Sequence, residues 1–438
     1  MKNSQKRTCC DISLIHQDEF HDFCKNGKSA SFTRNRKMPL TDLLFTMINR
    51  RGITLSLELR NYMKTAHPGT EISKPGYLKQ RMKLNPLAFY ELYRHHNRNF
   101  YADPGFSTFQ GYLVLAADGS GVNIPTTKET LEEFGTSSRK GTKPQASIGL
   151  GCLYDVMNRM ILESDCCKCK FDEMRLAEGQ IDRLPETIGT TPFLVVMDRG
   201  YPSTAAFIRM MEKGILFLAR LKSSDYKKEQ AAMAAPDAWV DICLDKSRIR
   251  HYQGTDIGRR MEELGHVTLR MVKVPLPDNK EEVLITNLPS ETFDHLKIAE
   301  LYRMRWGIET AYGTLKDRLQ IENFTGTKPI LLLQDIYSTI YISNLAEDII
   351  RDAEAELDEK EKPRKHKMMI NRTLSIGILK NDLIYILLET DAQKQDKLFQ
   401  QIYEDISKNL VPIRPDRHYH RTQGQLAGKY SNTHKRAY

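Results

Sequence analysis

Apolar residues recur at helical spacing between residues 294 and 319. One arc of this stretch is apolar and consists of Ile298, Leu301, Ile308, Tyr312, Leu315 and Leu319, which predicts a long helix with one side in the core. The neighbouring arc carries Tyr302, Arg305, Glu309 and Lys316, at spacings of three, four and seven residues. A phenol, a guanidinium, a carboxylate and an ammonium in one row suit phosphate chemistry at a metal site. Arg and Glu four residues apart are also an ordinary surface pair.

The first 105 residues predict helices. Helical spacing of apolar residues covers 40–49, 53–66 and 86–100. Residues 72–83 predict a basic helix that Ser73 caps. Its side chains Tyr77, Lys79, Arg81 and Lys83 could face DNA, and a solvated lysine-rich helix fits the pattern equally well.

Residues 106–225 alternate between short apolar runs and helical patterns. The runs predict strands at 112–116, 147–154, 160–164, 193–197 and 215–221, and the helical patterns lie at 171–184 and 203–213. This order predicts an α/β fold with a mixed sheet.

The remaining segments differ in character. Residues 226–290 predict a β-rich insertion, with strands at 239–244, 266–274 and 282–286, large enough for a subdomain. Residues 330–347 predict a buried helix, 352–367 a solvated charged stretch, and 374–388 and 397–406 further helices. Residues 412–438 predict a basic, mostly extended tail that could lie along phosphates.

Composition narrows the class of protein. A chain of 438 residues favours two or three domains, and Lys plus Arg exceed Asp plus Glu by 9, which is compatible with a polyanionic partner. No apolar run reaches the ~18 residues of a membrane span, and no signal peptide is recognisable. We therefore expect a soluble, cytoplasmic protein without a membrane partner.

Cys166, Cys167 and Cys169 lack a second Cys or His pair at finger-like spacing, which favours reduced, strand-borne thiols over zinc. Phosphate-binding loop motifs are absent, so we expect no nucleotide cofactor.

Two acids follow apolar strands, Asp118 and Asp198, at the place where α/β sheets commonly hold ligand-binding residues. Glu309, on the predicted helix, is the third candidate. Three converging carboxylates can hold two divalent cations, and these can activate an attacking oxygen and stabilise a leaving oxygen in phosphoryl transfer.

These residues resemble the DDE transposases of bacterial insertion sequences, in the branch marked by a Tyr-(2)-Arg-(3)-Glu-(6)-Lys signature. The signature is complete in Tyr302, Arg305, Glu309 and Lys316. The acid motifs that resemble those of the family are residues 114–120, with the sequence VLAADGS, and 195–201, with the sequence VVMDRGY. The resemblance covers roughly residues 70–325.

The resemblance implies an α/β, ribonuclease-H-like catalytic core with a β-rich insertion subdomain, between helical N- and C-terminal regions. The expected division is a DNA-binding region at 1–105, the core at 106–225 and 291–350, the insertion at 226–290, and a helical, basic region at 351–438. The first acid would come from the first strand, the second would follow the fourth strand, and the third would lie on a later helix.

The resemblance also implies roles. Asp118, Asp198 and Glu309 would bind two Mg²⁺ or Mn²⁺ ions, Tyr302 and Arg305 would contact phosphates near the transposon end, and Lys316 would position the terminal nucleotides. The implied partners are double-stranded DNA, as terminal inverted repeats and as target, and a second copy of the chain in the DNA complex.

Several alternatives stay open. Arg199 could touch DNA or form a salt bridge within the fold. For Trp306 we expect a buried core indole, with stacking on a base as the alternative. For the whole chain, the alternatives to a transposase are a metal-dependent nuclease of the same fold and a non-catalytic DNA-binding transposase remnant.

Overall fold

The computed structural model describes residues 1–34, 37–138, 143–276, 280–359 and 366–414. Over these residues the main sheet has eight strands in the order β3–β2–β1–β4–β5–β8–β7–β6. Its strands are β1 (Leu113–Asn123), β2 (Ser147–Asp155), β3 (Met160–Lys168), β4 (Phe193–Met197), β5 (Leu216–Arg220), β6 (Asp237–Cys243), β7 (His266–Leu276) and β8 (Lys280–Thr286). β1, β4 and β5 are mutually parallel, and the other neighbouring strands pair antiparallel. The predicted mixed sheet is confirmed.

Helices cover both faces of this sheet. Side chains alternate between the two faces along each strand, so neighbouring residues of β1 contact different helices. Leu113, Leu115 and Ala117 of β1 pack with α8 (Glu173–Arg183) and α10 (Thr204–Glu212). On the other face, Val114 packs with α14 (His295–Met304), and Ala116 shares a core with α15 (Gly307–Gly313). Even-numbered residues of β1 therefore point toward α14 and α15.

The predicted helix at 294–319 is divided. α14 ends at Met304, α15 begins at Gly307, and a π-helical segment follows at Thr314–Arg318. Around the break, the N–H groups of Arg305, Trp306 and Ile308 each donate to the carbonyl three residues earlier, at 3.2 Å. The glycine at 307 fits here because a Cβ would lie 3.3 Å from Val156 Cβ, so the chain passes close to the β2–β3 turn.

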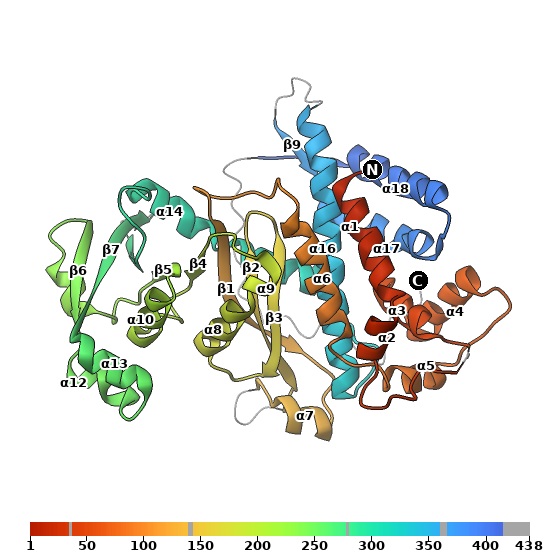
Figure 1. The fold of residues 1–438 in the computed structure, drawn as a ribbon, viewed down its shortest axis with the longest axis horizontal. Coiled ribbons are helices and arrows are strands. Elements are labelled where there is room, and N and C mark those ends of the chain that lie inside the picture. Colours follow the sequence, from red (N-terminus) through yellow and green to blue (C-terminus); the bar gives the residue numbers. More distant parts are fainter. Residues whose placement is uncertain (35–36, 139–142, 277–279, 360–365, 415–438) are drawn as a thin grey trace.

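The terminal regions form a helical body at one end of the sheet, beside β3 (Figure 1). The N-terminal helices are α1 (Asn3–Ile15), α2 (Asp18–Phe23), α3 (Leu40–Ile48), α4 (Leu55–Ala66), α5 (Lys74–Arg81) and α6 (Ala88–Ala102). The C-terminal part contributes α16 (Pro329–Glu359), α17 (Arg372–Leu388), α18 (Ala392–Lys408), β9 (Met368–Ile370) and β10 (Leu410–Pro412). α16 contacts α1, α3, α6, α17 and α18, so both termini share one core.

α5 corrects one prediction. Ser73 caps it as expected, accepting from Gly76 N at 3.2 Å. Tyr77 and Arg81, however, are buried and cannot face DNA. Arg81 is held instead by Asp335 of α16, with Nη2 2.8 Å from Oδ1, and this carboxylate also pairs with Arg50 at 3.0 Å.

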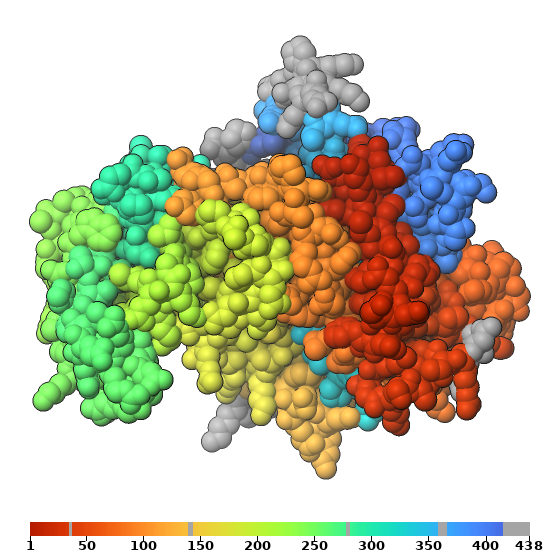
Figure 2. Space-filling model, in the orientation of Figure 1, coloured from red at the N-terminus to blue at the C-terminus, as the bar shows by residue number. Residues whose placement is uncertain are grey.

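The predicted β-rich block at 226–290 contains β6, β7 and β8, together with α11 (Lys227–Ala232), α12 (Lys246–Ile249) and α13 (Asp256–Leu264). β8 pairs with β5, so the block extends the central sheet and shares its core. It forms the end of the molecule opposite the terminal helices (Figure 2). Two further helices, α7 (Lys128–Phe134) and α9 (Pro185–Ile188), complete the fold.

The remaining predictions concern the cysteine cluster, the basic tail and membrane spans. The cysteines of the 166–169 cluster are free thiols, and two of them lie on β3. Most of the predicted basic tail falls at 415–438, outside the described residues. Among the described helices, none is both long and apolar enough to cross a membrane.

Candidate active site

The first two candidate acids lie on neighbouring parallel strands. The last paired residues of β1 and β4 are Ala117 and Met197, and Asp118 and Asp198 follow them directly. Both acids belong to the face covered by α14 and α15, because they lie two residues beyond Ala116 and Val196 of that face. The two carboxylates are therefore brought to the same place by strand register.

The position of Asp118 differs from the prediction in one respect. The sequence Asp118-Gly119-Ser120-Gly121 was expected to end the strand, but β1 continues to Asn123, and Asp118 pairs with Cys152 of β2. Gly119 lets the Phe171 ring pack closely against β1, because a Cβ at position 119 would lie 2.7 Å from that ring. The acid consequently sits within a strand, paired with β2, one residue beyond the end of the pairing with β4.

The helical side of the site meets these acids. Tyr302 Oη donates to Asp198 Oδ1 at 3.4 Å. The Arg305 guanidinium lies 5.8 Å from the centroid of the Tyr302 ring, and its Nη2 donates to Glu309 Oε1 at 2.9 Å. The row of side chains predicted from spacing is thus present, and it runs from Asp198 through the guanidinium to Glu309.

Tyr312 fixes α15 against the sheet beside the first acid. Its hydroxyl lies 2.8 Å from Asp118 O and 3.0 Å from Leu150 O, bridging β1 and β2. The helix that carries Glu309 is therefore attached to the backbone of the residue that carries the first carboxylate.

Lys316 lies one step farther along β1, where its Nζ donates to Ser120 Oγ at 2.7 Å. Burial lowers the pKa of Lys316, against the raising effect of the Glu322 and Asp317 charges. The π-helical segment that carries it is closed by Leu319 N donating to Thr314 O at 2.9 Å.

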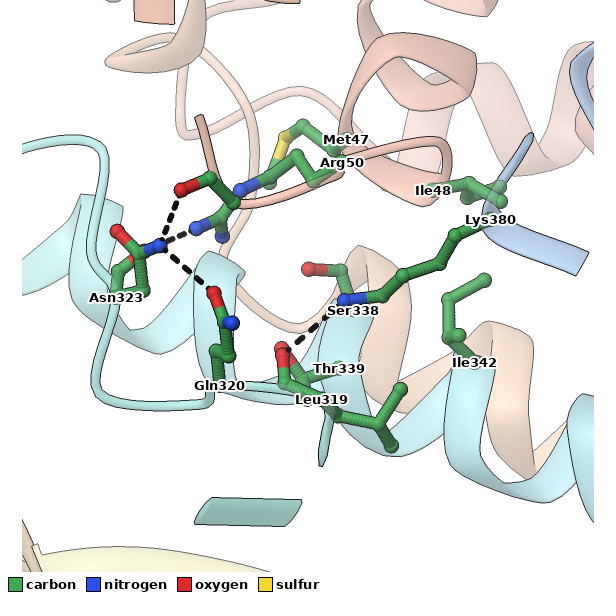
Figure 3. A pocket seen from close by; sticks show the side chains of 11 residues that line it. Met47, Ile48, Arg50, Leu319, Gln320, Asn323, Ser338, Thr339, Ile342 and Lys380 are labelled. Atoms are coloured by element: carbon green, nitrogen blue, oxygen red, sulfur yellow. Dashed lines mark hydrogen bonds between the residues drawn. The ribbon is translucent and has the colours of Figure 1, made fainter. Parts of the chain in front are cut away.

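Contacts from both terminal regions hold the end of this segment (Figure 3). Lys380 of α17 donates to Leu319 O at 3.4 Å, and Asn323 Nδ2 donates to Gly52 O at 2.6 Å and to Gln320 Oε1 at 3.1 Å. Gly52 cannot be replaced cheaply, since its φ of +87° is one that residues with a Cβ rarely adopt. The helical body thereby helps to position Lys316.

Electrostatics reveal an acid that sequence reasoning missed. The pKa of Asp118 is raised to about 6, chiefly by burial and also by the charges of Glu173 and Asp198, against the lowering effects of the Gly119 N–H and Arg305. Glu173, the first residue of α8, lies so close that its Oε1 would be 3.0 Å from a Cβ at position 119. Burial and the charge of Asp198 also raise the pKa of Glu173. The only signal in the sequence was the glycine at 119, which leaves room for this carboxylate.

Arg305 provides the balancing charge. Burial lowers the pKa of Arg305, but the Glu309 hydrogen bond and the charges of Tyr302 and Asp198 outweigh burial and raise it overall. The guanidinium is therefore a permanent cation between the acids, and its buried Nε has no acceptor among the described residues.

The donor set fits divalent cations in its chemistry, because carboxylate oxygens are the ligands that Mg²⁺ and Mn²⁺ prefer. Asp118, Asp198 and Glu173 together place several negative charges in a small space, and divalent cations would offset their repulsion. Within the described residues, however, no three His, Cys, Asp or Glu side chains lie close enough together to hold a metal, and Glu309 is paired with Arg305.

Two other predicted contacts have different outcomes. Arg199 is exposed and forms no salt bridge with any described residue. Trp306 was expected in the core, but half of its surface is exposed, because the break between α14 and α15 turns it outward. The prediction of a buried core indole is therefore wrong, and stacking on a base stays a prediction.

Comparison with known proteins gives the class. The family model for the transposase DDE domain matches residues 109–345, more than half of the chain, and the chain belongs to this family. The match includes Asp118, Asp198, the signature residues and α16 up to Leu345.

Individual relatives match less. A segment of 69 residues is 32% identical to the putative transposase InsL for insertion sequence element IS186A of Escherichia coli K12. The transposase for insertion sequence element IS421 of Escherichia coli matches with the same identity and length. The segment is 16% of this chain and about a fifth of the length of each relative. Among solved structures, a chain of the piggyBac transposase synaptic complex with hairpin DNA has 10% identity and a TM-score of 0.47, over 90% of this chain and 84% of that one.

Proposed function

We propose that this protein is a DNA transposase that cuts at the ends of an insertion sequence and joins them to target DNA. The observation that carries the proposal is the register of β1 and β4, which sets Asp118 beside Asp198. Tyr302 of the signature bonds to Asp198, and Arg305 of the signature bonds to Glu309. This arrangement occurs in a chain of the transposase DDE family.

The fold order supports a ribonuclease-H-like core. The first acid lies on the first strand, the second directly follows the fourth, and the third lies on a later helix. Asp118, Asp198 and Glu309 would hold two Mg²⁺ or Mn²⁺ ions, which when bound supply the positive charge for activating the attacking oxygen and stabilising the leaving oxygen.

The chain's own residues then have distinct tasks. Arg305 would bind a phosphate oxygen with its unused Nε, and Tyr302 would orient Asp198 through its hydroxyl. Lys316 and the exposed Arg199 would contact the DNA strand on either side. Trp306, next to Arg305, would stack on a base of that strand.

The test uses DNA that flanks the gene. Inverted repeats found there are built into a duplex and incubated with the protein and Mg²⁺ or Mn²⁺. A transposase cuts at the outer edge of the repeat and yields product joined to a second DNA. Nicking without joined product supports a nuclease of the same fold, and metal-independent binding of the repeat without any cutting supports a DNA-binding remnant. A protein that neither binds nor cuts the repeat contradicts all three.

The proposed assembly is a dimer that holds two DNA ends. Sedimentation of the protein with the repeat duplex tests it, and a complex of one protein with one duplex would contradict it.

A further inference from the structure

A cavity lies on the flank of α15 that faces away from the candidate active site. Its volume is about 380 Å³, and its wall includes Thr310 and Thr314 of the α15 and π-helical segments, and Glu347 of α16. Glu309 and Lys316 occupy the other flank of the same helical segments, at the candidate active site. The two sites are thus separated by roughly the ~10 Å width of a helix.

The cavity is lined by three arginines and one acid, so its net charge is positive. Arg159 comes from the β2–β3 turn and Arg318 from the end of the π-helical segment, and neither side chain forms an ion pair or hydrogen bond with any described residue. Arg372 pairs with two acids, through Nε with Glu347 at 3.1 Å and through Nη2 with Glu354 at 2.9 Å. Arg159 and Arg318 therefore have no ion-pair partner of their own among the described residues.

Arg372 adds a buried donor that has no acceptor. Only 9% of its side chain is exposed, and its Nη1 has no hydrogen-bond partner among the described residues. A buried N–H without a partner is costly, so an acceptor from outside the chain is expected. Arg372 is also the first residue of the 17-residue helix α17, whose N-terminal end favours anions and opens into the same cavity.

Arg159 is held in a conformation that suits glycine. Its φ is +60°, in the left-handed region that side chains with a Cβ rarely adopt. Its N–H donates to Asp155 O at 2.8 Å, which closes the tight turn. The turn thus carries an arginine at a position that glycine would occupy without strain.

We propose that this cavity binds a backbone phosphate of DNA, outside the catalytic acids; the proposal rests on the proposed function, that the chain acts on DNA. The guanidinium groups of Arg159 and Arg318 and the unpartnered Nη1 of Arg372 donate to the phosphate oxygens. A DNA strand that crosses α15 occupies the active site on one flank and this cavity on the other. The contact reads no sequence and fixes the strand relative to Glu309.

The test compares wild-type protein with the double variant Arg159→Gly, Arg318→Gln. Both are titrated with a fluorescent mixed-sequence duplex, without divalent metal, over a series of KCl concentrations. Each phosphate that is no longer neutralised lowers the slope of log affinity against log salt by about 1, so the double variant, which loses the one phosphate of this cavity, is expected to lose about 1. Arg159→Gly also relieves the left-handed strain, so its unfolding temperature should not fall. Arg303→Gln removes an exposed arginine of α14 and is expected to leave the slope unchanged.

The outcomes separate the two proposals. A double variant with the wild-type slope overturns the phosphate site, while wild-type cutting of the repeat duplex leaves the proposed function standing. Wild-type protein that binds no duplex overturns both. Thermal unfolding in inorganic phosphate, against chloride at equal ionic strength, distinguishes the source of the phosphate. If phosphate stabilises only the wild type and the DNA slopes are equal, the cavity binds a small free anion and the DNA assignment is wrong.

Discussion

Replacing Lys380 by methionine tests whether burying this ammonium beside Leu319 lowers the stability of the fold. The Lys380 ammonium enters the cavity of Figure 3, where it lies 3.4 Å from Leu319 O, its one hydrogen bond within the described residues. The pKa of Lys380 is lowered to about 8, chiefly by burial and also by the charge of Arg50, against the raising effect of Glu58. The folded chain thus holds a poorly solvated cation.

The size of this effect follows from the two pKa values. A lysine that titrates at about 8 when folded and at 10.5 when unfolded costs about 3 kcal/mol at pH 7, since one pH unit corresponds to about 1.36 kcal/mol. Because the folded pKa is the lower one, the unfolded chain binds more protons between these values, and wild-type stability rises with pH there. Methionine is uncharged and adapts to irregular cavities. Lys380→Met is therefore expected to be up to about 3 kcal/mol more stable than wild type at pH 7, and the gain should vanish as the pH approaches 10.5.

Urea unfolding of both proteins at neutral and alkaline pH measures this difference through the midpoint and the slope. Lys394→Met, at an exposed position of α18, serves as the control and should show no pH-dependent difference. If Lys380→Met is less stable than wild type at pH 7, or if its advantage is the same at both pH values, the desolvation reasoning is refuted.

Three further predictions follow from buried contacts. Tyr312→Phe should lower the free energy of unfolding by about 1–2 kcal/mol and slow repeat cutting, because the helix loses its attachment to Asp118 O; urea unfolding and the cutting rate check both, and unchanged values would contradict the attachment. Arg81→Met should cost about 3–5 kcal/mol, since it strips a partner from buried Asp335; exposed Lys79→Met is the matched control, and equal stabilities of the two would contradict the burial of Arg81. For His96, burial lowers the pKa, but two aspartates outweigh burial and raise it to about 9, so its stabilisation is complete below pH 6.5 and lost as the pH rises through 9. The difference in stability between wild type and His96→Gln should shrink over that window, and a constant difference would exclude a charged imidazole.

The parts of the fold that the sequence predicted correctly are those with strong local patterns. The strand 193–197 has its predicted bounds because five consecutive apolar residues end at Asp198, and it is buried between two parallel neighbours. The end of β1 was predicted wrongly because Asp118-Gly119-Ser120-Gly121 has the composition of a turn, whereas pairing with β2 keeps it extended.

The missed features depend on contacts between distant segments. Arg81 looked like a surface residue of a basic helix, and only its ion pair with Asp335 explains its burial. Glu173 carries no spacing signal that links it to Asp118, and their proximity depends on how α8 packs on the sheet. The row Tyr302–Arg305–Glu309 was predictable because helical spacing is a local property, and it persists although the helix is divided.

The most direct test of the account is repeat cutting by Glu309→Gln with Mg²⁺ or Mn²⁺, beside wild type and Glu300→Gln. Glu300 lies exposed on α14, and glutamine at 309 keeps an oxygen for Arg305 while removing the charge. The account predicts that Glu309→Gln binds the repeat duplex like wild type but neither cuts nor joins it, while Glu300→Gln does both. A Glu309→Gln protein that cuts at the wild-type rate would contradict the assignment of the active site.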